Sequence, residues 1–224
     1  MKKVAIAIDG PSGAGKSSIA KALSKKLGII YVDTGAIYRT VGLYVFRNNV
    51  DSKDAPKIIS ILPEITVKLA YVDGTQHIYL NGEDVSGLIR TETISKYASD
   101  VSAIPEVRAF LLSLQRDMAK ENSVIMDGRD IGTVVLPDAE VKIFLTASAE
   151  VRAQRRYKEL VEKGEKVVFE DVLAAIIARD TNDSSRATAP LKAADDAVIL
   201  DSSDINAEQT LNAVIDIINS KAAE

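Results

Sequence analysis

A short glycine-rich segment near the N-terminus carries the strongest chemical signal in the sequence. Residues 10–17 read Gly-Pro-Ser-Gly-Ala-Gly-Lys-Ser and fit the phosphate-loop pattern G-x-x-x-x-G-K-[ST]. In such a loop, glycines let backbone N–H groups approach a phosphate, and the following helix adds the positive end of its dipole. Lys16 can reach the β- and γ-phosphates of a nucleoside triphosphate, and the Ser17 hydroxyl can bind Mg²⁺.

The flanks of this segment fit the strand–loop–helix context that a phosphate loop needs. The apolar run Val4–Ile8 predicts a buried strand, and Ile19, Leu23 and Leu27 recur every four residues in a predicted helix over 16–27. We therefore predict that the chain binds a nucleoside triphosphate with Mg²⁺. The predicted contacts of this nucleotide, assigned to ATP on the resemblance described below, are Gly10, Pro11, Ser12, Gly13, Ala14, Gly15, Lys16, Ser17 and Ser18.

Two arginines follow predicted strands, Arg39 after 29–32 and Arg129 after 123–126. Ligands of open α/β sheets bind at the carboxyl ends of the strands, so both arginines are expected on the rim that carries the phosphate loop. A guanidinium group binds phosphate through two parallel hydrogen bonds, which favours a second, phosphorylated substrate. For Arg129, a surface ion pair with Asp130 is the alternative.

Two further sets of arginines lie on consecutive predicted helices. Arg152, Arg155 and Arg156 have i, i+3, i+4 spacing on a helix over 149–162, and Arg179, Asp183 and Arg186 share a flank of the next helix and its end. The connecting loop 162–168 is rich in Lys, Glu and Gly. This arrangement predicts a lid that closes to exclude water, with a solvated helix face as the alternative.

The remaining pattern alternates predicted strands and helices, which is typical of an α/β fold with a mainly parallel five-stranded sheet. Helices are predicted at 36–47, 55–62, 91–100, 105–121, from 169 onward and at 206–220, and further strands at 141–145 and 197–200. Residues 64–86 differ, because alternating apolar residues flank the turn-forming pairs Asp73-Gly74 and Asn81-Gly82. We predict a small antiparallel sheet there.

Composition excludes several classes of function. The 224 residues include no cysteine and one histidine, His77, so a disulfide scaffold, a thiol nucleophile and a His-rich metal site are excluded. The net charge of −4 argues against a non-specific nucleic-acid binder. The N-terminal apolar run is too short for a signal peptide, and no run suggests a membrane span. We expect a cytoplasmic protein with no nucleic-acid or membrane partner.

Among proteins with phosphate loops, a small-molecule kinase fits best. The guanine-reading tetrad N-K-x-D of regulatory GTPases is absent from the sequence. A motor or helicase would need a more basic surface. A kinase with a phosphorylated acceptor must neutralise two polyanions, as the arginines would.

The chain resembles the bacterial cytidylate kinases, a family of P-loop nucleoside monophosphate kinases, over essentially its whole length. The resemblance rests on residues 9–17, on Asp33-Thr34-Gly35-Ala36-Ile37-Tyr38-Arg39, on Gly82-Glu83-Asp84-Val85-Ser86, on the stretch DGRDIGTVV at 127–135, and on the segment 179–191. It implies a five-stranded parallel core, a lid, a β insert, and transfer of the γ-phosphate of ATP to CMP or dCMP. Another acceptor (UMP or dephospho-coenzyme A) or a non-catalytic nucleotide-binding module is the alternative.

The resemblance also implies roles for single residues. Thr34, Arg39 and Arg129 would hold the CMP phosphate, Ser99, Arg108 and Asp130 would read cytosine, and Arg179 and Asp183 would reach the sugar. The predicted catalytic residues are Lys16, Arg129, Arg155 and Arg186, and the predicted Mg²⁺ ligands are Ser17 and Asp127. Asp33 has no role that the sequence suggests.

The predicted organisation is a kinase core of residues 1–62 and 87–224, with the lid at about 152–186 and the β insert at 63–86. We expect a monomer.

Overall fold

The computed structural model describes residues 3–72 and 74–222. The chain divides into two compact units. Met1–Ile29 together with Ser123–Glu224 form the first, here called the phosphate-loop unit, and Ile30–Asn122 form the second, here called the middle unit.

The larger sheet has five strands in the order β2-β6-β1-β7-β8. The strands are β1 (Ala5–Asp9), β2 (Ile30–Asp33), β6 (Val124–Gly128), β7 (Val141–Thr146) and β8 (Val198–Asp201). β1 is parallel to both β6 and β7, and β7 is parallel to β8. Because β1 is central, Ile6, Ala7 and Ile8 are almost fully buried, as its continuous apolar run predicts. The predicted α/β fold with a parallel five-stranded sheet is confirmed.

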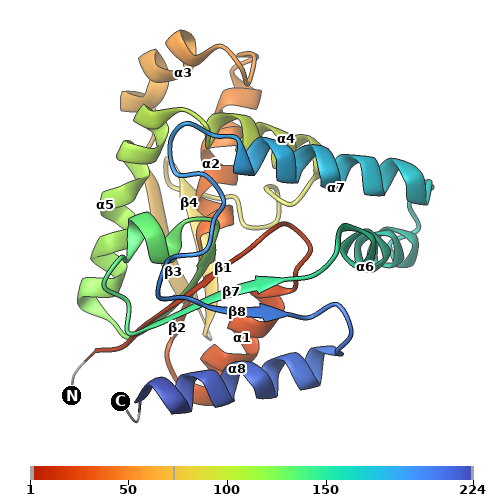
Figure 1. Cartoon of the computed structure of the whole chain (residues 1–224). Helices are drawn as coiled ribbons and strands as arrows, with labels where there is room; N and C mark the ends of the chain where they lie inside the picture. Colours follow the sequence, from red (N-terminus) through yellow and green to blue (C-terminus); the bar gives the residue numbers. More distant parts are fainter. Residues whose placement is uncertain (1–2, 73, 223–224) are drawn as a thin grey trace. The chain divides into compact units, whose positions relative to one another are not determined.

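Four helices of the phosphate-loop unit match the predicted helices closely. They are α1 (Lys16–Leu27), α6 (Ala149–Glu162), α7 (Phe169–Ser184) and α8 (Ala207–Ala222). α1 and α8 pack together, as Figure 1 shows.

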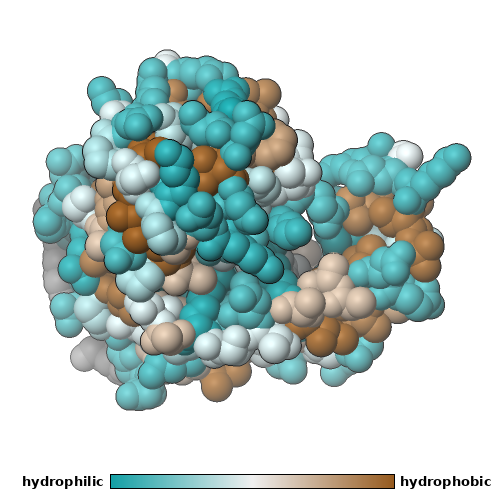
Figure 2. Space-filling view, turned by 90° about the horizontal axis from the view of Figure 1, so that it is seen from above, coloured by the Kyte–Doolittle hydropathy of each residue, from teal (hydrophilic) through white to brown (hydrophobic). Residues whose placement is uncertain are grey.

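The helices α6 and α7 form a hairpin with an apolar cluster of its own. Its buried members are Ala153, Leu160, Val172 and Ile176. The rings of Tyr157 and Phe169 meet edge to face at a centroid distance of 6.0 Å. Hydrophobic residues also lie on the surface over α6 and α7 in Figure 2, and Val161, Val168 and Ile177 are among the exposed apolar side chains. This hairpin is the segment predicted to act as the lid.

The middle unit begins with β2 and contains the predicted antiparallel insert. Its helices are α2 (Thr34–Arg47), α3 (Ala55–Ile61), α4 (Glu92–Val101) and α5 (Pro105–Glu121). β3 (Val67–Val72), β4 (Thr75–Leu80) and β5 (Glu83–Asp84) form a three-stranded antiparallel sheet. The predicted turn at Asp73-Gly74 includes Asp73, which lies outside the described residues.

Two short elements of the described residues were not predicted, and one of them is a 3₁₀ turn, Leu62–Glu64, directly after α3. A π-helical turn, Ile131–Val135, follows β6, within the stretch that contains Arg129 and Asp130. Across the described residues, no helix combines the length and the apolar character that a membrane crossing requires.

The start of the phosphate loop depends on Gly10. Its φ is +146°, and a Cβ added there would lie 1.9 Å from the backbone oxygen of Leu145 on β7. Gly15 also has a positive φ, +92°, but a Cβ there would meet nothing within 4 Å. A residue with a side chain would therefore have a strained backbone at either position, but its Cβ would clash with a neighbouring atom only at Gly10.

We predict that Gly10→Ala lowers the free energy of unfolding by about 3 kcal/mol or more, because backbone conformation and close packing both oppose the methyl group. The matched variant Gly15→Ala should cost only about 1–2 kcal/mol, from backbone strain alone. Urea denaturation of both variants measures the difference. Equal destabilisation would contradict the close approach of Gly10 to Leu145.

Candidate active site

The phosphate loop lies between β1 and α1 and places Lys16 at the first position of the helix. The residue before it, Gly15, adopts the left-handed conformation at the N-cap. The side chain of Lys16 points back into the loop, where Nζ donates to the carbonyl oxygen of Pro11 at 2.7 Å. Only 6% of Lys16 is exposed, so its ammonium group is held inside the loop.

Positive charge gathers around Lys16. Burial, followed by the charge of Arg129, holds the pKa of Lys16 well below its ordinary value, and the charge of Arg179 acts in the same direction. Asp127 and Asp9 oppose this shift but do not cancel it. An anion such as a phosphate would therefore be attracted to this place, because it would relieve repulsion among three cationic groups.

Ser17 and Asp127 form an oxygen-rich pair beside the loop. The Ser17 hydroxyl donates to Oδ2 of Asp127 at 2.7 Å, although 110 residues separate the two in sequence. Mg²⁺ prefers oxygen ligands and binds through one or two protein groups together with water and substrate phosphates. A hydroxyl and a carboxylate in contact fit that donor set, so the two predicted ligands lie together.

The lid helices meet the phosphate loop through Arg152. This side chain is buried, and its Nη1 donates to the carbonyl oxygen of Ser12 at 3.1 Å. The same guanidinium group binds both carboxylate oxygens of Asp180 on α7, at 3.0 and 2.6 Å. The sequence placed Arg152 on one helix face with Arg155 and Arg156, and it gave Asp180 no role of its own. Arg152 therefore joins α6, α7 and the loop in one hydrogen-bonded network.

The other two arginines of α6 have different partners. Nη2 of Arg155 donates to the carbonyl oxygen of Ser202 at 2.7 Å. Arg156 pairs with Glu159 at 3.0 Å. The catalytic role predicted for Arg155 thus requires its guanidinium group to leave Ser202.

Asp183 joins two of the predicted phosphate-binding arginines. It accepts a hydrogen bond from Nε of Arg129 at 2.8 Å and another from Nη2 of Arg186. Burial opposes ionisation of Asp183, but the charges of Arg129 and Arg186 prevail and hold its pKa below the ordinary value. The structure therefore brings these three predicted site residues together.

Asp9 fixes the stretch that follows Arg129. Its carboxylate accepts hydrogen bonds from the backbone N–H groups of Ile131 and Gly132, at 2.8 and 2.7 Å. It thereby holds the π-helical turn directly after Asp130, which is itself buried. Burial raises the pKa of Asp9 to about 6, although the two backbone hydrogen bonds partly counteract it.

The middle unit carries four predicted acceptor-binding residues on three helices. Thr34 and Arg39 lie on the first turns of α2, Ser99 lies on α4, and Arg108 lies on α5. Arg108 is buried and its guanidinium carbon lies 5.5 Å from the centre of the Tyr38 ring, a cation–π arrangement. Tyr38 therefore packs against a predicted cytosine-reading arginine.

Asp33 has a clear local role that the sequence did not suggest. It is the N-cap of α2, where Oδ1 accepts from the Ala36 N–H at 2.9 Å. Its other oxygen accepts from Nη2 of Arg90 at 3.0 Å. Asp33 therefore fixes the start of the helix that carries Thr34 and Arg39.

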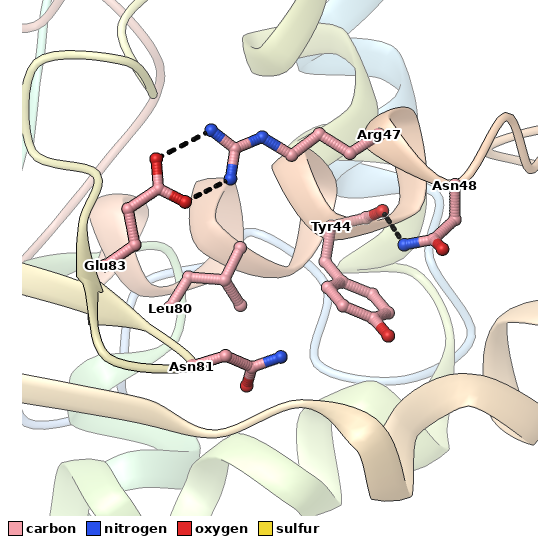
Figure 3. A pocket seen from close by; sticks show the side chains of 6 residues that line it. All are labelled: Tyr44, Arg47, Asn48, Leu80, Asn81 and Glu83. Carbon is pink, nitrogen blue, oxygen red and sulfur yellow. Dashed lines mark hydrogen bonds and ion pairs between the residues drawn. The ribbon is translucent and has the colours of Figure 1, made fainter.

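A surface pocket of about 220 Å³ lies elsewhere in the middle unit, between α2 and the insert. Figure 3 shows Arg47 and Glu83 joined by two hydrogen bonds, and Asn48 bound to the Tyr44 carbonyl oxygen. Leu80 and Asn81 complete the lining. The predicted ATP and CMP contacts lie at other positions, so this pocket is not the candidate site.

Comparison with known proteins decides the family. The family model named "Cytidylate kinase" matches residues 6–220. The chain belongs to the cytidylate kinase family. A cytidylate kinase from Caldicellulosiruptor saccharolyticus is 52% identical over 217 residues, which cover 97% of this chain and 96% of that protein. A cytidylate kinase from Thermosipho melanesiensis is 49% identical over 216 residues, which cover 96% and 97% of the two chains.

One solved structure agrees in fold alone. A crystal structure of an uncharacterized protein from Eubacterium ventriosum superposes with a TM-score of 0.52 at 13% identity, and it covers 97% of this chain and 99% of that one.

In this member of the cytidylate kinase family, Asp9 should make stability depend on pH. Its pKa rises from 3.8 to about 6 on folding, so between these values the folded chain binds more protons than the unfolded chain. The free energy of unfolding should therefore fall as pH rises through this window, with about 3 kcal/mol attributable to Asp9.

Asp9→Asn removes this titration, although it also weakens one of the two backbone hydrogen bonds. We predict lower stability for the variant at pH 4 and a smaller deficit at pH 7, measured by denaturant unfolding. Asp138→Asn, at an exposed carboxylate, is the control. A stability difference between wild type and Asp9→Asn that does not change with pH would contradict the assignment.

Proposed function

We propose that this protein transfers the γ-phosphoryl group of ATP to CMP and dCMP, which gives CDP or dCDP and ADP. The observation that carries the proposal is the buried ammonium group of Lys16, held inside a phosphate loop with the charges of Arg129 and Arg179 acting on it, in a chain of the cytidylate kinase family. A polyanionic substrate would attract all three cationic groups.

On the donor side, residues 10–18 would bind the ATP phosphates through backbone N–H groups. Lys16 would exchange the Pro11 carbonyl oxygen for phosphate oxygens, since its ammonium group is already inside the loop. Arg152 would keep the loop in place through Ser12.

The Mg²⁺ ion of the proposed reaction would be held by Ser17 and Asp127. When bound, it supplies positive charge to the phosphate oxygens of ATP. The two protein groups would set its position next to the loop, because they already lie in contact.

On the acceptor side, we assign three binding tasks, and two further arginines act during transfer. Thr34, Arg39 and Arg129 bind the phosphate of CMP. Ser99, Arg108 and Asp130 recognise cytosine, and Arg179 and Asp183 contact the sugar. Arg186 and Arg155 neutralise charge on the phosphates during transfer.

The chemistry needs no general base. The acceptor phosphate has a second pKa near 6 and is largely dianionic at neutral pH. One of its oxygens attacks the γ-phosphorus in line while the bond to the β–γ bridging oxygen breaks and ADP leaves. The protein therefore contributes alignment and charge neutralisation.

The α6–α7 hairpin, within the lid of about 152–186, would exclude water so that ATP is not hydrolysed. The hydrogen bonds of Arg152 support this role. They connect Asp180 on α7 to Ser12 in the phosphate loop, so a movement of α7 would shift the loop as well.

An acceptor panel tests the function. Purified protein with Mg²⁺ and ATP is offered CMP, dCMP, UMP, dephospho-coenzyme A and shikimate, and the products are identified by chromatography. We expect CDP and dCDP as the main products. Hydrolysis of ATP without CDP, or faster turnover of another acceptor, would refute the proposal.

The choice of cytosine over uracil should depend on hydrogen-bond polarity. A carboxylate only accepts hydrogen bonds and a guanidinium group only donates them, so Asp130 with Arg108 would match the amino group and ring nitrogen of cytosine and oppose uracil at both points. Sites of this kind reject a mismatched analogue by as much as ~10⁴.

We predict that Asp130→Asn narrows the CMP-to-UMP ratio of kcat/KM, chiefly by lowering activity on CMP, because an amide can both donate and accept. The exposed-site variant Asp138→Asn should keep the wild-type ratio. Equal kcat/KM for CMP and UMP in the wild type would contradict this explanation of specificity.

A further inference from the structure

The insert contacts the backbone of β2 at its carboxyl end. β2 is the last strand in the order of its sheet, so within residues 3–72 and 74–222 one of its edges has no neighbouring strand. In an extended strand, residues two apart direct their peptide groups to the same edge, as Tyr31 and Asp33 do here. The Tyr71 hydroxyl donates to the carbonyl oxygen of Tyr31 at 3.1 Å, and the Asp33 N–H donates to Oε1 of Gln76 at 2.9 Å.

These two contacts come from a single cross-strand pair. Tyr71 on β3 and Gln76 on β4 lie directly opposite each other in the antiparallel register. Burial raises the pKa of Tyr71 above its ordinary value, which keeps the hydroxyl protonated as a donor. One pair of the insert thus satisfies an acceptor and a donor on β2, and both Tyr31 and Asp33 are buried.

The position of Asp33 decides where α2 begins. Its carboxylate caps the helix at Ala36 and is held by Arg90, while its N–H is held by Gln76. Thr34 follows at once. The guanidinium group of Arg39 lies back over the same turn, because a Cβ on Gly35 would be 3.0 Å from its Nη1.

We propose that Tyr71 and Gln76 are positioning residues for the acceptor phosphate, which act by fixing the junction of β2 and α2 in the geometry that Thr34 and Arg39 need. The inference rests on the proposed function of these two residues as phosphate contacts. It gives the β insert a task in the reaction: to preorganise a site without touching the substrate. The residues assigned to cytosine recognition (Ser99, Arg108 and Asp130) lie outside β2 and the first turn of α2, so cytidine binding is expected to change less than CMP binding.

Two small substitutions separate the positioning role from simple folding. Tyr71→Phe removes one hydroxyl and keeps the ring, and Gln76→Met keeps the side-chain length and removes the acceptor. Gln76→Glu retains an oxygen acceptor and serves as the rescue variant. Tyr79→Phe is the matched control, because Tyr79 lies on β4 but on the face opposite Gln76.

The readout is the affinity of each variant for CMP and for cytidine, which lacks the phosphate, measured by calorimetry or by competition. A neutral hydrogen bond changes an equilibrium by about three- to tenfold, so Tyr71→Phe and Gln76→Met should each weaken CMP binding by that factor. Cytidine binding and KM for ATP should stay within twofold of wild type. Gln76→Glu and Tyr79→Phe should bind CMP nearly as wild type does.

The outcomes are distinct. If Tyr71→Phe and Gln76→Met melt at lower temperature but keep the wild-type ratio of CMP to cytidine affinity, the two residues are only structural and the inference is wrong. If CMP and cytidine affinity fall together, the junction does not act through the phosphate, and the inference fails as well. If the wild type itself neither binds nor phosphorylates CMP, the proposed function fails first.

Discussion

The burial of Lys16 near two arginines is the constraint on which the phosphate-loop unit depends. Removing an ammonium ion from water costs several kcal/mol unless nearby groups compensate. Here the Pro11 carbonyl oxygen and the carboxylates of Asp127 and Asp9 compensate in part, while Arg129 and Arg179 add repulsion. The free protein therefore keeps an ammonium group inside the loop that its neighbours compensate only in part, and we propose that the phosphates of a nucleotide complete the compensation.

Carboxylates hold three arginine side chains of the phosphate-loop unit in place. Asp183 holds Arg129 and Arg186, and Asp180 holds Arg152 against the loop. Buried pairs of this kind add little net stability, because desolvation offsets much of the attraction. Their contribution is geometric, since each guanidinium group is kept at a defined place, where the phosphates of the proposed substrates would compete for it. Such sites commonly lower stability for the sake of function.

The elements could be predicted from the sequence because each is signalled locally. Three such signals depend only on residues that are close in sequence. They are the apolar run at 4–8, the apolar side chain at every fourth residue in Ile19, Leu23 and Leu27, and the Asn81-Gly82 turn. The phosphate loop could be predicted for the same reason, since its pattern and both of its flanks are contiguous.

What escaped prediction depends on contacts between distant residues. Helical spacing places Arg152, Arg155 and Arg156 on one face, but only packing decides that Arg152 meets Ser12, 140 residues away, while Arg155 meets Ser202. The π-helical turn forms where Asp9, 122 residues earlier, accepts from Ile131. Asp33 is held by two residues that are distant in sequence. Gln76 lies on the insert, and Arg90 lies just after it. The spacing of residues along the chain indicates which side chains share a helix face. It does not indicate which distant residues these side chains contact.

The stability of Lys16→Met, with and without Mg²⁺ and ATP, tests the central claim most directly. Without nucleotide, the variant should be at least as stable as the wild type, because removal of a buried charge relieves desolvation and repulsion. With Mg²⁺ and ATP at about 100 times the dissociation constant, the wild type should gain about 2.7 kcal/mol and the variant little. Lys21→Met, at an exposed lysine of the same helix, should behave as the wild type does. A Lys16→Met variant that is markedly less stable alone, yet gains the full stabilisation from nucleotide, would contradict the account.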